Sequence, residues 1–176
     1  FEESNDWNGP GGNPLIVNYP SENTYIGNPT LDPEGAIDSN NITYVFSGSG
    51  SISFTKIDSD GTLLISGQTI ITGANAWTNE IRVAIDTNDR IYLAWSKDMH
   101  DITYAYSDDG GINWSEQISL CYNAADQLNK PQICCDNNDN VHIVWQHWTG
   151  ASNLLSYMKL GPDGTVAIDE SFLTQS

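Results

Sequence analysis

The sequence predicts an all-β protein that is built from repeated four-stranded antiparallel sheets and contains essentially no helix. Three observations support this prediction. Short apolar segments alternate with period two, turns rich in Asp, Asn and Gly separate these segments, and the pattern recurs about every fifty residues. Period two is the side-chain periodicity of a strand, and no segment shows the 3.6-residue period of an amphipathic helix.

The first half of each unit reads as a strand, a turn rich in Asp and Asn, and a second strand that ends on an aromatic residue. The three copies occupy residues 36–46, 84–95 and 134–145. Their leading aspartates are separated by 48 positions (38 to 86) and 50 positions (86 to 136), although Asp32 is an alternative start for the first unit. Such spacing indicates a repeat protein.

The second half of each unit adds two further strands. A strand and a glycine turn recur at residues 52–61, 102–111 and 155–164, and another β-rich run follows each turn. The second strand of a unit, such as residues 91–95, is apolar at nearly every position, as expected when both faces of a sheet are covered. Neighbouring blades cover a blade of a β-propeller in this way. The sequence therefore predicts β-propeller-type repeats, with about three four-stranded blades plus an N-terminal strand.

We expect a single β-propeller domain over residues 1–176. Residues 1–27 are the end of a preceding blade, and three blades follow at residues 28–78, 79–128 and 129–176. Closed rings usually have about four to eight blades. Two interpretations therefore remain open. Either further blades come from a longer chain, as the first residue, Phe, also suggests, or copies of the chain self-associate.

Residues 107–114, with the sequence SDDGGINW, fit the pattern S-x-D-x-G-x-x-W. This segment resembles the Asp box, or BNR repeat, of sialidase-like β-propellers. In a tight turn the aspartate can accept hydrogen bonds from backbone N–H groups, and the glycine can adopt a positive φ. The turns at residues 58–61 and 161–164 keep an Asp and the glycine but lack the Trp. The resemblance implies a structural role, far from any active site, for Ser107, Asp109, Gly111 and Trp114.

The chain is strongly acidic, with 6 Lys and Arg residues against 23 Asp and Glu residues and a net charge of −17. This charge repels phosphate backbones and anionic lipids, so we expect no nucleic-acid partner. No apolar run reaches about 18 residues, so no membrane insertion is expected. The composition suits an exported protein, extracellular or at the cell surface. Cys121, Cys134 and Cys135 allow one disulfide from Cys121 or three thiols, and their spacing does not fit a zinc site.

The first turn of each unit is rich in oxygen atoms that could bind a cation. Ca²⁺ prefers clustered oxygen ligands, so weak calcium binding is one hypothesis, and no other cofactor is expected. The alternative is that these turns favour Asp and Asn for their local hydrogen bonds alone. The candidate metal ligands are Asp86, Asn88, Asp136 and Asn138.

The variable loops of such a blade lie at the edge opposite the repeated turns. Loops on a rigid scaffold are where binding usually resides, and here they carry aromatic and histidine residues. Aromatic faces beside amides and carboxylates suit sugar rings. The candidate ligand-binding residues are Trp77, His100, His147 and Trp148. Alternatively, Trp77 and Trp148 pack against neighbouring blades.

The resemblance to sialidases also implies an arginine triad that holds a sugar carboxylate, but the chain has only two arginines, Arg82 and Arg90. No GxSxG, HExxH or P-loop pattern is present. We therefore expect a non-catalytic extracellular or cell-surface module that binds a glycan or a protein, or that assembles on a surface. The alternatives are a fragment of a sialidase-like glycoside hydrolase with catalytic residues in other blades, and a structural subunit of a surface filament or array.

Overall fold

The computed structural model describes residues 33–48 and 50–173, without the side chains of residues 77–79. These residues form three four-stranded antiparallel sheets and no helix, which confirms the predicted fold class. The first sheet contains β1 (Glu34–Ile37), β2 (Thr43–Gly48), β3 (Ser51–Ile57) and β4 (Leu63–Thr72). The second contains β5 (Ala76–Ile85), β6 (Ile91–Lys97), β7 (Asp101–Ser107) and β8 (Ile118–Tyr122). The third contains β9 (Gln127–Cys135), β10 (Val141–Trp148), β11 (Asn153–Leu160) and β12 (Val166–Phe172).

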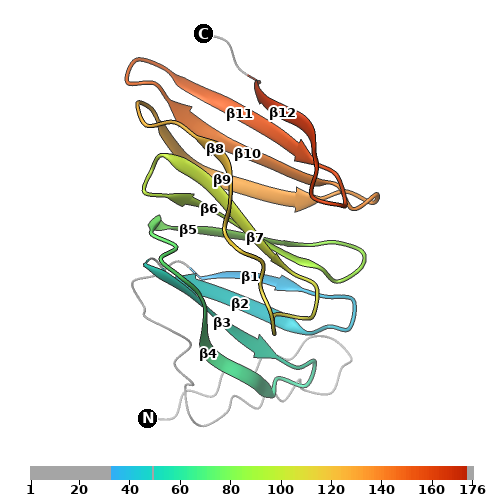
Figure 1. The fold of residues 1–176 in the computed structure, drawn as a ribbon. Helices are drawn as coiled ribbons and strands as arrows, with labels where there is room; N and C mark the ends of the chain where they lie inside the picture. The colour runs from blue at the N-terminus through green and yellow to red at the C-terminus, as the bar shows by residue number, and fades with distance from the viewer. Residues whose placement is uncertain (1–32, 49, 174–176) are drawn as a thin grey trace, which may run out of the picture.

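The three sheets stack face to face, each with its strands in sequence order (Figure 1). Strand β5 packs against β1 and β2, and β9 packs against β5, β6 and β7, so the first strand of each sheet lies against the preceding sheet. The turns within strand pairs, such as β1–β2, β5–β6 and β9–β10, gather at the right of Figure 1, and we call this side the turn edge. The β4–β5, β6–β7, β8–β9 and β10–β11 connections gather at the left, and we call this side the loop edge.

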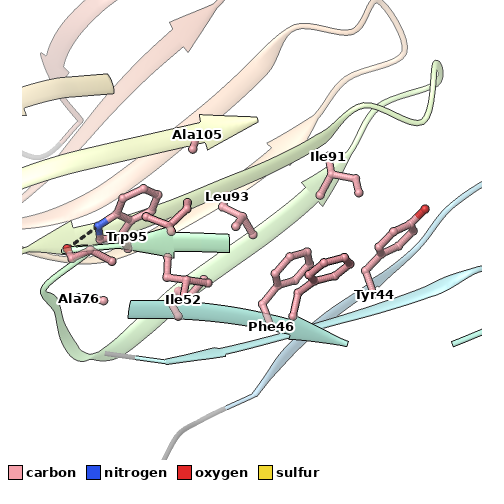
Figure 2. Packing of buried hydrophobic residues seen from close by; sticks show 12 residues of the cluster. Tyr44, Phe46, Ile52, Ala76, Ile91, Leu93, Trp95 and Ala105 are labelled. Carbon is pink, nitrogen blue, oxygen red and sulfur yellow. Dashed lines mark hydrogen bonds between the residues drawn. The ribbon is translucent and has the colours of Figure 1, made fainter. Parts of the chain in front are cut away.

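Two apolar layers hold the stack together. Between the first and second sheets, Phe46 and Phe54 stack with ring centroids 5.9 Å apart, and Trp95 packs beside them (Figure 2). Between the second and third sheets the layer is built on Tyr92, Tyr104, Ile143, Trp145 and Met158. Trp95 and Trp145 end the apolar part of β6 and β10 at equivalent repeat positions, and both are 0% exposed.

The leading aspartate of each unit closes its own turn at the turn edge. Oδ1 of Asp86 accepts hydrogen bonds from the backbone N–H groups of Asn88 at 2.9 Å and Arg90 at 3.0 Å. Asp38 and Asp136 make the same pair of bonds in the first and third units. Asp38 is therefore the equivalent of Asp86, which fixes the start of the first unit.

A second set of turn bonds links one sheet to the next. Carboxylate oxygens of Asp89 accept bonds from the backbone N–H of Ser39 at 2.8 Å and from its hydroxyl at 2.6 Å. Asp139 accepts the equivalent bonds from Thr87 at 3.0 and 2.7 Å. An aspartate in the turn of the second or third sheet thus accepts hydrogen bonds from the turn of the sheet before it, and these bonds set the register of the stack.

Three further expectations concern residues 1–27, the cysteines and membrane insertion. The expected end of a preceding blade, residues 1–27, lies outside the described residues. All three cysteines are free thiols, so the disulfide from Cys121 does not form. Among the described residues there is no helix long and apolar enough to cross a membrane.

Candidate functional site

The candidate site lies at the loop edge, where the second and third sheets meet. Two loops bring it together: residues 98–100 between β6 and β7, and residues 123–126 between β8 and β9. The backbone N–H of Asn123 donates to the carbonyl oxygen of His100 at 2.8 Å, and the N–H of Leu128 donates to the carbonyl oxygen of Met99 at 2.7 Å. These bonds fix the two loops against each other and place His100 beside the second loop.

His147 lies at the centre of the site. It is on β10, it is 4% exposed, and the alternation of that strand directs its side chain towards the second sheet. Its Nε2 lies 2.8 Å from Oδ2 of Asp126, and its Nδ1 lies 3.2 Å from Oε1 of Glu170 on β12. One imidazole ring therefore joins a carboxylate of the loop to a carboxylate of the last strand.

A carboxylate accepts hydrogen bonds but donates none, so each of these contacts of His147 depends on a proton carried by the ring nitrogen or by the carboxyl group. Asn123 Nδ2 also donates to Oδ2 of Asp126 at 2.8 Å, which further fixes this carboxylate.

Two further groups extend the cluster. The thiol of Cys121 on β8 contacts Oε2 of Glu170 at 3.1 Å, and burial, followed by this contact, raises the pKa of the thiol to about 12. Nδ1 of His100 lies 2.7 Å from the backbone carbonyl oxygen of Asp126. The structure thus brings together two of the predicted binding residues, His100 and His147, through Asp126.

Two exposed aromatic side chains lie at the same edge of the blades as the cluster. Trp148 ends β10 and is 38% exposed, and the alternation of the strand directs its side chain to the face opposite to that of His147. Tyr122 ends β8 and is also exposed. Residues 123–126 join Tyr122 to Gln127, which pairs with Trp148 across β9 and β10. The predicted binding residue Trp77 is on β5, but its side chain lies outside the described part of the structure. The loop edge therefore combines partly exposed rings with fixed carboxylates and amides.

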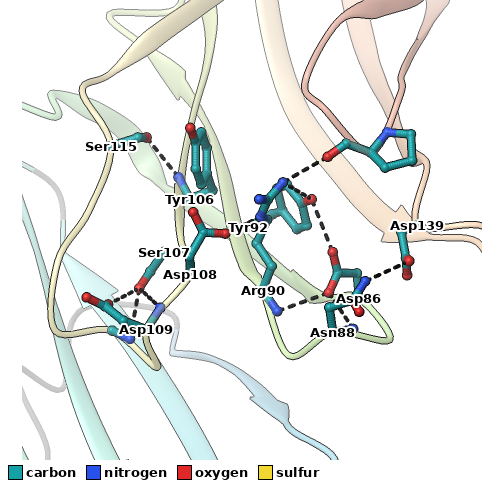
Figure 3. A network of polar contacts seen from close by, with 12 residues as sticks. Asp86, Asn88, Arg90, Tyr92, Tyr106, Ser107, Asp108, Asp109, Ser115 and Asp139 are labelled. Atoms are coloured by element: carbon teal, nitrogen blue, oxygen red, sulfur yellow. Dashed lines mark hydrogen bonds and ion pairs between the residues drawn. The ribbon is translucent and has the colours of Figure 1, made fainter.

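The residues that resemble an Asp box, Ser107, Asp109, Gly111 and Trp114, lie at the opposite, turn edge (Figure 3). The hydroxyl of Ser107 accepts a bond from the N–H of Gly111 at 2.9 Å, and Asp109 accepts one from the N–H of Asn113 at 2.8 Å. Gly111 has a φ of +89°, and the indole N–H of Trp114 donates to its carbonyl oxygen at 3.1 Å. The segment forms a self-bonded turn that packs on the first sheet.

The candidate metal ligands lie in hydrogen-bonded turns at the turn edge. Asp86 and Asp136 accept hydrogen bonds from backbone N–H groups of their own turns. Asn88 Nδ2 donates to Asp139 at 2.8 Å, and the backbone N–H of Asn138 donates to Asp136 at 2.8 Å. In the described part of the chain, no three His, Cys, Asp or Glu side chains are grouped so that they could hold a metal ion.

Neither arginine lies in the site at the loop edge. Arg90 is at the turn edge, where it pairs with Asp108 and donates to the Tyr92 hydroxyl at 3.4 Å and the Pro162 carbonyl oxygen at 2.8 Å (Figure 3). Arg82 donates to the carbonyl oxygen of Ile81 at 2.8 Å. Within the described residues, the loop edge thus offers carboxylates but no guanidinium.

Sequence reasoning missed the two acids that hold His147. Asp126 lies in the loop between β8 and β9, which the repeat places at the same edge as residues 73–75, so the repeat alone could have pointed to it. Glu170 is on β12, the outermost strand of its sheet, and acidic residues on such a strand are usually exposed to solvent and have no special role. No sequence signal pairs it with His147.

Solved structures with similar folds are carbohydrate-active proteins. An α-L-arabinofuranosidase from Clostridium thermocellum ATCC 27405 has a TM-score of 0.54 and 17% identity, over 82% of this chain and 55% of that chain. A family 43 glycoside hydrolase engineered to show endo-xylanase and exo-arabinofuranosidase activity has a TM-score of 0.59 and 14% identity, over 84% and 29%. A mutant of NanB sialidase from Streptococcus pneumoniae has a TM-score of 0.55 and 17% identity, over 80% and 23%. The three sheets are β-propeller blades.

This likeness shows the fold alone, because the identities are low. The chain spans from about a quarter to just over half of the length of these three structures. No family model matches the sequence, and no curated protein matches it.

Proposed function

We propose that this chain is a non-catalytic, glycan-binding part of an extracellular or cell-surface β-propeller, and that the loop edge contacts the glycan. The observation that carries the proposal is the arrangement around His147. This buried ring fixes Asp126 and Glu170 at the same edge at which Trp148 is exposed. At such an edge the partly exposed indole can stack on the apolar face of a sugar, and the fixed acceptors and amides can bind sugar hydroxyl groups.

The names of the similar structures support a carbohydrate ligand. They include an arabinofuranosidase, a sialidase, an exo-β-1,3-galactanase and an ulvan lyase. We also propose that the chain belongs with the Asp-box propellers, because residues 107–114 form a self-bonded turn between β7 and β8. The lack of a guanidinium among the described loop-edge residues favours binding over sialidase chemistry.

Affinity electrophoresis in gels that contain arabinan, xylan, galactan or ulvan tests this function. We expect at least one polysaccharide to retard the chain, and Trp148→Ala to remove most of that retardation. Ile112→Ala is the matched control, because Ile112 is exposed at the turn edge, away from the proposed site. This variant should bind the polysaccharide as the unmodified chain does. Equal retardation of all three proteins would contradict glycan binding at the loop edge.

A second candidate function, glycoside cleavage, is favoured by one specific observation. Asp126 and Glu170 both reach the same imidazole and so form a pair of carboxyl groups at one edge, and glycosidases use such a pair about 5–9.5 Å apart. Fluorogenic glycosides distinguish the two functions. Turnover that disappears in both Asp126→Asn and Glu170→Gln would establish the enzyme, whereas binding without turnover supports the proposed function.

A further inference from the structure

A cavity at the turn edge lies between the second and third sheets, well away from the loop edge. It has a volume of about 280 Å³. Three tyrosine rings, of Tyr92, Tyr104 and Tyr106, line it from the second sheet, and Val141 and Leu160 line it from the third. Its wall therefore combines aromatic and aliphatic side chains with polar atoms, among them phenolic hydroxyl groups.

The interface that holds the cavity also lacks two aromatic rings that the first interface has. Between the first and second sheets, Trp114 packs edge-on against Phe46, with ring centroids 5.8 Å apart and planes at 84°. At the next interface, Ala94 takes the repeat position of Phe46. Aligned on its turn glycine, the third unit has Ala167 where the second has Trp114. The two rings that fill the first interface are thus absent from the second.

Two polar side chains of the cavity, those of Tyr104 and Arg90, can contact a ligand. Tyr104 is 3% exposed, yet its hydroxyl makes no hydrogen bond with any described residue, and it faces Gly164 at the cavity wall. The hydroxyl is therefore available to a ligand that supplies a hydrogen-bond acceptor or donor at the cavity wall. Arg90 lines the cavity as well, with its guanidinium 5.1 Å from the centroid of the Tyr106 ring.

The charges around the cavity select against an anion. Arg90 is already paired with Asp108, and Asp163 lies on the cavity wall. The local balance is therefore acidic, as is the whole chain. A neutral ligand with one apolar face and several hydroxyl groups matches tyrosine rings and scattered polar atoms. The volume lies at the lower end of ligand pockets, roughly 300 Å³, which limits the ligand to a single ring.

We propose that this cavity is a second binding site, which takes one neutral sugar ring. The ring stacks on the tyrosines, and a sugar hydroxyl completes the hydrogen bonding of Tyr104. The inference goes beyond glycan binding at the loop edge, because it assigns a separate site at the opposite edge of the blades.

Isothermal titration calorimetry of the full chain with methyl glycosides of arabinose, xylose and galactose tests the site. For so small a ligand we expect a Kd of about 1 mM for at least one glycoside. Tyr104→Phe keeps the ring and removes the hydroxyl, and should weaken binding about 10-fold. Ile118→Trp places a large ring at the cavity wall on β8 and should abolish binding, while Ile112→Trp, the same change at an exposed residue that does not line the cavity, should not.

The possible outcomes separate this site from the loop edge. Loss of binding in Ile118→Trp but not in Trp148→Ala supports the cavity site, whatever the result of the polysaccharide gels. Loss in Trp148→Ala alone assigns the sugar to the loop edge and overturns the cavity proposal. No saturable binding of any of the three glycosides also overturns it, as does binding that neither Tyr104→Phe nor Ile118→Trp changes.

Discussion

Trp95 and Trp145 form a natural pair for measuring what one buried hydrogen bond contributes to this fold. They occupy equivalent positions on β6 and β10, and both are 0% exposed. The indole N–H of Trp95 donates to the carbonyl oxygen of Ala74 at 2.9 Å (Figure 2). The indole N–H of Trp145 is buried and has no partner among the described residues. The same substitution to Phe therefore removes a hydrogen bond at one site and an unsatisfied donor at the other.

The magnitude follows from this difference. Both substitutions lose a similar buried volume, so that cost largely cancels between them. Trp95→Phe also leaves the carbonyl of Ala74 without its donor, which costs about 1–3 kcal/mol. Trp145→Phe carries no such penalty, because it removes a group that is already unpaired. We expect Trp95→Phe to lower the free energy of unfolding by about 1–3 kcal/mol more than Trp145→Phe does.

Differential scanning calorimetry is the appropriate assay, because both variants change the tryptophan fluorescence of the protein. For a chain of this size, about 1 kcal/mol corresponds to roughly 2–4 °C in Tm. Trp95→Phe should therefore melt about 2–12 °C below Trp145→Phe. Equal melting temperatures, or a lower value for Trp145→Phe, would refute the assignment of this hydrogen bond.

Three further predictions concern a turn glycine, a thiol and a surface carboxylate. Gly111→Ala should lower Tm more than Gly61→Ala. The two glycines have nearly the same φ, +89° and +88°, but only the Cβ added at Gly111 meets a ring, that of Phe54 at 2.9 Å. At pH 8, iodoacetamide should modify exposed Cys134 much faster than Cys121, whose pKa burial raises to about 12, and equal rates measured by mass spectrometry would contradict this. Hydrogen bonds from the neighbouring turn lower the pKa of Asp139, so its stabilisation is complete above pH about 4 and is lost as the pH falls through the folded value. Asp139→Asn should therefore narrow the Tm difference between pH 7 and pH 3, and an unchanged difference would exclude this contribution.

The fold was largely predictable because both the strands and the turns of the repeat carry recognisable sequence patterns. Strand β6 is apolar on both faces, which predicted a sheet covered on both sides, and the structure packs it between β5, β7 and the neighbouring sheets. The turn aspartates predicted tight connections, and Asp86 makes the expected local bonds. Residues 107–114 also form a single self-bonded turn. Local signals of this kind survive in sequence because each depends on residues close together in the chain.

The candidate site was less predictable because it depends on contacts between distant residues. His147 was identified from its loop-edge position, but its two partners are 21 and 23 residues away, in a loop and on another strand. The sequence around a histidine in an apolar strand does not indicate which acidic residues it will contact in the folded protein. The cavity at the turn edge was not foreseen either, because its walls come from both the second and the third sheets.

The oxygen-rich turns illustrate how one sequence pattern supports two physical explanations. Clustered Asp and Asn oxygens suggest a cation, but in this fold the neighbouring turns supply hydrogen-bond donors to the same atoms. Asp139 takes three such bonds, from the N–H and hydroxyl of Thr87 and from the side-chain amide of Asn88. A bound calcium ion would have to replace these donors, and with them a link between the second and third sheets. The turn carboxylates therefore hold the blades in register.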